Sequence, residues 1–137
     1  MKCLVTALLV FGHMASESAL GCTRSPVPQN LQQVEEWYGF SGYVFVAQVQ
    51  TVSNVSLSEE QHSLRILEAF KGDLDPTEVA INNVGTTCSA VLKLDEQYLI
   101  FAGRNVDGRL SINGAVVRMD RATDFIPVLR DLRESDL

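Results

Sequence analysis

GYVFVAQVQTV, from Gly42 to Val52, is the segment of the chain richest in strand-forming residues. It opens with an unbroken apolar run from Tyr43 to Ala47 and then mixes polar and apolar residues up to Val52. An apolar run is typical of a strand covered on both faces, and alternation is typical of a strand with one solvated face. The sequence therefore predicts a long central strand whose second half ends exposed to solvent.

Shorter elements follow on either side of this strand. Further strands are predicted over His62–Phe70, Glu78–Asn82, Gln97–Ala102 and Arg109–Ile112, and polar residues predict a long loop over Ser53–Gln61. Apolar residues three and four apart predict helices over Gln29–Tyr38 and Ala122–Glu134. We therefore expect an all-β fold with flanking helices: a five-stranded OB-fold barrel, with one helix before the first strand and one at the C-terminus. A two-layer α+β sheet is the alternative.

The composition is that of one globular domain. The 137 residues are 46% hydrophobic and 20% charged, which is enough for a buried core. The formal net charge of -6 disfavours a nucleic-acid binder, and an anionic membrane surface would repel the chain. Two histidines and three cysteines are too few for most His/Cys metal cages, so we expect no cofactor and no metal of its own.

Residues 1–21 have the pattern of a secretory signal peptide. Lys2 supplies a positive charge, Leu4–Phe11 is a short apolar run, and Ala19-Leu20-Gly21 offers small residues for cleavage. The apolar run is far shorter than a membrane span, so the alternative is a buried N-terminal helix rather than an anchor. The sequence predicts a secreted mature chain, residues 22–137. In a eukaryotic host, the sequon at Asn54 would then be available for glycosylation.

The mature chain would keep two cysteines, Cys22 and Cys88. In an exported protein, two cysteines most simply form one disulfide, which here would fix the first mature residue to the domain. A bacterial lipoprotein is a second interpretation, because such proteins are also cut before a cysteine that then carries lipid. Ala19 and Leu20 stand in the reverse of the usual order for that pattern. The location is then the bacterial envelope or periplasm.

The sequence offers little for catalysis. It contains no nucleophile elbow, phosphate-binding loop or zinc-protease helix motif. The one histidine of the mature chain, His62, falls at the start of a predicted strand and is interpreted as an exposed polar residue. The carboxylates of Asp73, Asp75, Asp95 and Glu96 fall at predicted turns and are interpreted as solvated. We therefore expect a protein that is not an enzyme.

The start of the mature chain, Cys22-Thr23-Arg24-Ser25-Pro26-Val27-Pro28-Gln29, resembles that of the tissue inhibitors of metalloproteinases. The resemblance continues at intervals through the chain. It is carried by Ser41–Val49 as a first barrel strand, Ala69-Phe70-Lys71-Gly72 as a turn, Thr86-Thr87-Cys88 as a loop, and Tyr98–Gly103 with Asp107–Ile112 as closing strands. It implies a single netrin-like OB-fold domain over residues 22–137, without the family's smaller C-terminal subdomain.

The resemblance implies a zinc metalloproteinase as partner and an inhibitory role for Cys22. The α-amine and carbonyl of Cys22 would chelate the protease's zinc and displace the water that the protease needs as nucleophile. A disulfide from Cys22 to Cys88 would hold this chelating group in place. The protease contacts would come from Thr23, Arg24, Ser25, Pro26, Thr86 and Thr87.

The sequence departs from the family's pattern at Arg24. The family has a cysteine at this position, and the partner of that cysteine would fall near Ala115. Both cysteines are missing here, and so is the third disulfide of the family's inhibitory domain. Arg24 therefore places a long charge where the family has a buried sulfur.

A netrin-like binding module without a protease target is the alternative function. It would be lipid-anchored or secreted. Acylation of Cys22 would leave an amide nitrogen that cannot chelate zinc, and a start at any other residue would remove the chelating group. A small acidic domain of this kind is expected to be a monomer.

Overall fold

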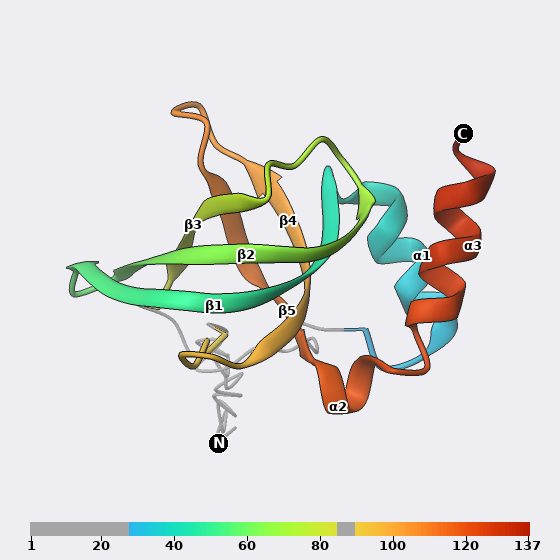
Figure 1. Ribbon diagram of the computed structural model, residues 1–137, viewed down its shortest axis with the longest axis horizontal. Coiled ribbons are helices and arrows are strands. Elements are labelled where there is room, and N and C mark those ends of the chain that lie inside the picture. Colours follow the sequence, from blue (N-terminus) through green and yellow to red (C-terminus); the bar gives the residue numbers. More distant parts are fainter. Residues whose placement is uncertain (1–27, 85–89) are drawn as a thin grey trace, which may run out of the picture.

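The computed structural model describes residues 28–84 and 90–137, except the side chains of residues 113 and 114 (Figure 1). The chain is mostly β-structure, with one helix before the first strand and two short helices at the C-terminus. In order, the elements are α1 (Leu31–Phe40), β1 (Tyr43–Ser56), β2 (Glu59–Lys71), β3 (Thr77–Asn83), β4 (Gln97–Arg104), β5 (Leu110–Arg118), α2 (Met119–Ala122) and α3 (Ile126–Ser135).

The five strands close into a barrel in the order β1-β2-β3-β5-β4. Every neighbouring pair is antiparallel except β3 and β5, which run parallel where Ala80–Asn82 meets Leu110–Ile112. This confirms the predicted OB-like barrel.

β1 has the two halves that its sequence predicts. Val44 and Val46 face the helices, whereas Phe45, Ala47 and Val49 face the barrel interior, so the first half is apolar at every position. β1 pairs with β4 only over Tyr43–Gln48, but it pairs with β2 as far as Ser56. From Gln50 to Ser56 every residue is exposed, and this part projects from the barrel as one strand of a hairpin (Figure 1).

The loop predicted over Ser53–Gln61 is wrong. β1 continues to Ser56, β2 begins at Glu59, and only Leu57 and Ser58 form the turn between them. Cross-strand pairs such as Asn54 with Glu60 extend the ladder through the polar segment. The hairpin is solvated at its end, so it lacks the apolar alternation by which a strand is recognised.

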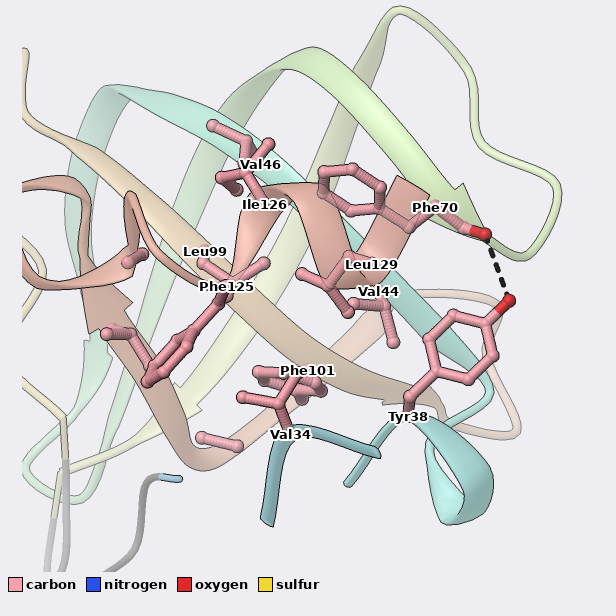
Figure 2. Close-up of a cluster of buried hydrophobic side chains, with 13 residues drawn as sticks. Val34, Tyr38, Val44, Val46, Phe70, Leu99, Phe101, Phe125, Ile126 and Leu129 are labelled. Carbon is pink, nitrogen blue, oxygen red and sulfur yellow. Dashed lines mark hydrogen bonds between the residues drawn. The ribbon is translucent and has the colours of Figure 1, made fainter. Parts of the chain in front are cut away.

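Two apolar clusters use the two faces of the shared strands. One fills the barrel; its members are Phe45, Ala47, Val49, Leu64, Ala80, Leu92, Tyr98, Ile100, Ala102, Leu110 and Ile112. The other lies between the barrel and the helices (Figure 2); its members are Val34, Tyr38, Val44, Val46, Phe70, Leu99, Phe101, Ala115, Val117, Ala122, Phe125, Ile126 and Leu129. The barrel thus buries its own interior and also one outer side.

The helices confirm the predicted elements with one correction. α1 is capped by the Asn30 side chain, which accepts a hydrogen bond from the Gln33 N–H at 2.9 Å. The single helix predicted over Ala122–Glu134 is instead split into α2 and α3, with Pro127 in the first turn of α3. Proline has no N–H to donate to the preceding turn, so it starts a helix readily and interrupts one that would continue through it.

Polar contacts fix α3 to the barrel. Arg130 donates two hydrogen bonds to the Glu68 carboxylate, at 2.9 and 2.8 Å, and Arg133 donates to the Ala69 carbonyl at 2.9 Å. The hydrogen bonds from Arg130 lower the pKa of Glu68. Tyr38 joins α1 to the ends of β2 and α3. Its hydroxyl donates to the Phe70 carbonyl at 3.3 Å (Figure 2) and to the Asp136 carboxylate at 2.6 Å.

Candidate functional site

The site residues predicted from the sequence lie outside the described residues. They are Cys22, Thr23, Arg24, Ser25, Pro26, Thr86, Thr87 and Cys88. The disulfide, the chelating amine and the protease contacts therefore stay predictions. The structure does place Val84 and Ala90, the described residues on either side of residues 85–89.

Those flanking residues are held at the hairpin end of the barrel. The Val84 N–H donates to the Ser58 carbonyl at 2.9 Å, which joins the end of β3 to the hairpin turn. On the return side, the Asn82 Nδ2 donates to the Ala90 carbonyl at 2.7 Å. Asn82 is completely buried, so this bond is shielded from competing water. Val84 and Ala90 are thereby tied to Ser58 and Asn82.

A hollow of about 470 Å³ opens at the same end of the molecule. We call it the tip hollow; it is lined by Asn54, Val55, Ser56, Leu57, Glu60 and Val84. Leu57 is fully exposed and Val55 is 53% exposed, so the rim is partly apolar. Glu60 is the one charged residue of this lining, and it belongs to a group of three polar side chains on neighbouring strands.

Glu60, His62 and Asn82 form this group, the inner polar cluster. Glu60 and His62 are two residues apart on β2, and Asn82 is the β3 partner of Glu60. His62 and Asn82 are completely buried, and the Glu60 Oε2 lies 3.4 Å from the His62 Nε2. Within the part of the chain that the structure describes, neither ring nitrogen of His62 nor the Oδ1 of Asn82 has a hydrogen-bond partner. Unpartnered buried polar atoms are uncommon, which makes this cluster a candidate functional site.

Burial governs the protonation of His62. It lowers the pKa of the imidazole, because the charged ring would lose its hydration. The Glu60 carboxylate and the main chain of Thr51 act in the opposite direction, with smaller effect. His62 is therefore neutral at pH 7, and its ring supplies one acceptor nitrogen to the cluster.

The interpretation of His62 as an exposed residue is wrong. β2 begins at Glu59 rather than at His62, so His62 lies inside the strand and not at its solvated start. A usable signal was present, because strand residues two apart share a face and the apolar Leu64 favours the buried face. The same periodicity places Glu60 and His62 on the inner face with Leu64. Asn82 could not be found in this way, because its place depends on the pairing of β2 with β3.

The other carboxylates examined in the sequence lie at turns. Asp73, Asp75 and Asp95 are exposed, and Asp95 has a positive φ of 66°. Glu96 is half-buried and accepts a hydrogen bond from the Tyr98 hydroxyl at 2.9 Å. Among residues 28–84 and 90–137, no three His, Cys, Asp or Glu side chains gather closely enough to hold a metal ion. In the same residues, no helix is both long and apolar enough to cross a membrane.

Comparisons with known proteins add no family. No protein-family model matches the chain, and no curated protein matches its sequence. The functional argument therefore rests on the residues and on the geometry of the barrel.

Proposed function

We propose that this protein is a secreted inhibitor of zinc metalloendopeptidases that binds the catalytic zinc through the amine and carbonyl of Cys22. The observation that carries the proposal is the closed five-stranded barrel with a helix before its first strand. This is the architecture that the resemblance to tissue inhibitors of metalloproteinases implies for an inhibitory domain. A barrel of this kind serves many functions, so the residues at the start of the mature chain must supply the specific one.

The chemistry of Cys22 suits this role. Its α-amine and carbonyl oxygen can bind one metal ion together in a five-membered chelate ring. A catalytic zinc keeps one position open for water, and the chelate would occupy that position. The pKa of an α-amine is about 7.7–8.0 in peptides, so the neutral form that binds metal is accessible at neutral pH. A disulfide from Cys22 to Cys88 would limit the ordering needed on binding.

The second half of the proposed contact surface comes from Thr86 and Thr87. The described residues on either side of residues 85–89, Val84 and Ala90, are hydrogen-bonded to Ser58 and Asn82. In the proposed complex, Thr23 enters the pocket for the substrate side chain that follows the cleaved bond. Arg24, Ser25 and Pro26 run along the cleft, and Thr86 and Thr87 line its other side.

The test begins with the intact mass and N-terminal sequence of the exported protein. We expect a free Cys22 and a mass lighter by the two hydrogens lost in one disulfide. Added acyl chains, or a start at another residue, would contradict the chelation mechanism and favour the binding module.

The second step of the test is inhibition of a panel of zinc metalloendopeptidases. Addition of one alanine before Cys22 converts the amine to an amide, so inhibition should be lost. The control is the thermal unfolding of the extended chain, which should match that of the unextended chain. Equal inhibition by both chains would contradict the proposal.

A further inference from the structure

The tip hollow has the chemistry of a site for a positively charged group. Glu60 is its one charged residue, and its side chain is 24% exposed. Within the described residues the Glu60 carboxylate has no lysine or arginine partner, and the His62 ring 3.4 Å away is neutral, so it does not balance the charge. A carboxylate in this position is available to a cation that enters the hollow from outside.

The other members of the inner polar cluster, His62 and Asn82, also favour a positively charged ligand. Asn82 uses its Nδ2 donor on the Ala90 carbonyl, which leaves its Oδ1 acceptor unpartnered. A neutral imidazole has one donor and one acceptor, and a carboxylate has acceptors only. The inner polar cluster therefore offers more acceptors than donors. A group that complements it must bring N–H donors and positive charge.

The hairpin beside the hollow indicates the form of the partner. β1 pairs with β2 as far as Ser56, but its other edge has no partner strand over Gln50–Ser56 in the described part of the chain. This edge contains no charged residue and no proline, which are common protections of exposed edges. On its paired side, register shifts with β2 flank Thr51–Asn54, so this is the regular part of the projecting strand. Unpaired main-chain groups of this kind are satisfied by another extended chain.

We propose that this end of the barrel binds an extended peptide segment that pairs with the Gln50–Ser56 edge and directs a lysine or arginine side chain to Glu60. The net charge of -6 favours the approach of a basic segment. The exposed side chains of Val55 and Leu57 give the aliphatic stem of the basic residue an apolar surface. This binding needs no zinc and no protease, and it goes beyond the proposed inhibition.

His62 makes the binding dependent on pH. When the ring gains a proton, it forms an ion pair with the Glu60 carboxylate and competes with the incoming cation for it. Among the described residues, Glu60 is the one charged side chain that acts on the ring. β1 contributes the main chain of Thr51, and β3 contributes the neutral Asn82. Burial lowers the pKa of His62. The loss of affinity for the peptide should therefore occur at pH values below those at which an ordinary imidazole gains its proton.

The experiment is an NMR titration of the ¹⁵N-labelled mature chain with the peptide acetyl-Thr-Val-Thr-Lys-Val-Thr-Val-amide. A matched peptide carries glutamine in place of lysine. We expect chemical-shift changes over residues 50–60, and an affinity for the lysine peptide about tenfold or more above that for the glutamine peptide. The same spectra report whether each variant is folded.

Two variants locate the charge. Glu60→Gln should remove the preference for lysine. Glu59→Gln makes the same change one residue earlier, on the other face of β2, and should leave the preference within about twofold.

A third variant tests the dependence on pH. His62→Gln should keep the preference for lysine at pH 7.5, and this preference should no longer be lost at lower pH.

Three results would overturn the proposal. They are equal binding of the two peptides, equal effects of Glu59→Gln and Glu60→Gln, and shift changes confined to residues outside 50–60 or absent. Because the titration contains no protease, its failure would leave the zinc-chelating proposal intact. Loss of inhibition in that proposal's test would likewise leave this one intact.

Discussion

His62 shows how one side chain links burial to pH. The unfolded chain holds this imidazole at its ordinary pKa of about 6.5, whereas burial in the barrel lowers the pKa. As the pH falls below 6.5, the unfolded state takes up the proton first, and the folded state loses stability. The Glu68 carboxylate has a lowered pKa as well, but it stays ionised between pH 7 and pH 5.

We therefore expect the free energy of unfolding to fall between pH 7 and pH 5 more steeply in the wild type than in His62→Leu. The leucine variant removes the titrating ring and places an apolar side chain of similar size in the barrel. Urea unfolding at several pH values measures the two curves. Parallel curves would show that His62 does not contribute to the acid sensitivity.

Gly72, directly after β2, gives a sharp test of backbone constraint. Its φ is +89°, and a Cβ at this position would meet the Tyr43 ring and lie 2.8 Å from the Gly42 carbonyl oxygen. Gly108 has a similar φ of +83°, but no atom lies within 4 Å of its Cβ position. The two glycines therefore share the conformational requirement and differ in the space around them.

Gly108→Ala should destabilise the protein by about 1 kcal/mol, from backbone strain alone. Gly72→Ala should cost about 3 kcal/mol, because strain and a collision with main chain and ring add together. Thermal or urea unfolding of both variants measures the difference. A similar loss in both would mean that the Tyr43 ring and the main chain move aside easily.

At the scale of elements, Tyr38 holds three segments together. Its ring lies in the cluster between barrel and helices, and its hydroxyl contacts the Phe70 carbonyl at the end of β2 (Figure 2). The same hydroxyl contacts Asp136 after α3. Burial, followed by the hydrogen bond to Asp136, raises the pKa of Tyr38 to about 12. Since the unfolded tyrosine ionises near 10, this contribution to stability is lost as the pH rises from 10 toward 12.

Tyr38→Phe keeps the ring and removes the hydroxyl, so it should lower the free energy of unfolding by about 1 kcal/mol. In a spectrophotometric titration at alkaline pH, the wild type should show one phenolate that forms near pH 12, and the variant should lack it. If the late phase persists in Tyr38→Phe, it belongs to another tyrosine, and Tyr98 is the candidate because its pKa is also raised.

The elements differ in how far the sequence could predict them. Apolar residues on both faces of β1 from Val44 to Ala47 made its buried half recognisable. The end of the hairpin was missed because its strands are solvated and are held by cross-strand hydrogen bonds that no local pattern reports. The split between α2 and α3 was predictable in principle from Pro127. Cys22 and the residues named with it stay predictions, whereas Asn82 joins Glu60 only through the strand register.

At the scale of the whole molecule, stability depends on two cores that share β1, β2, β4 and β5. Leu129 of α3 is completely buried against the outer side of the barrel, whereas Leu132, one turn later, packs only partly against the same cluster. Leu129→Ala should therefore cost about 2–5 kcal/mol, and Leu132→Ala should cost distinctly less. Urea unfolding followed by both fluorescence and circular dichroism measures these losses. Equal losses would show that α3 is not anchored through Leu129.

The parallel pair of β3 and β5 has a consequence for the order of events in folding. Its register covers Ala80–Asn82 with Leu110–Ile112, the shortest ladder in the barrel, and it joins strands far apart in the sequence. The hairpin of β1 and β2 and the pair of β4 and β5 can form earlier from nearer segments. Because this ladder is the shortest, we expect the barrel to open first at this seam, which contains Asn82, the hydrogen-bond partner of Ala90. The pairing of β2 with β3 assembles the inner polar cluster, and closure of this seam adds the pairing of Asn82 with Ile112.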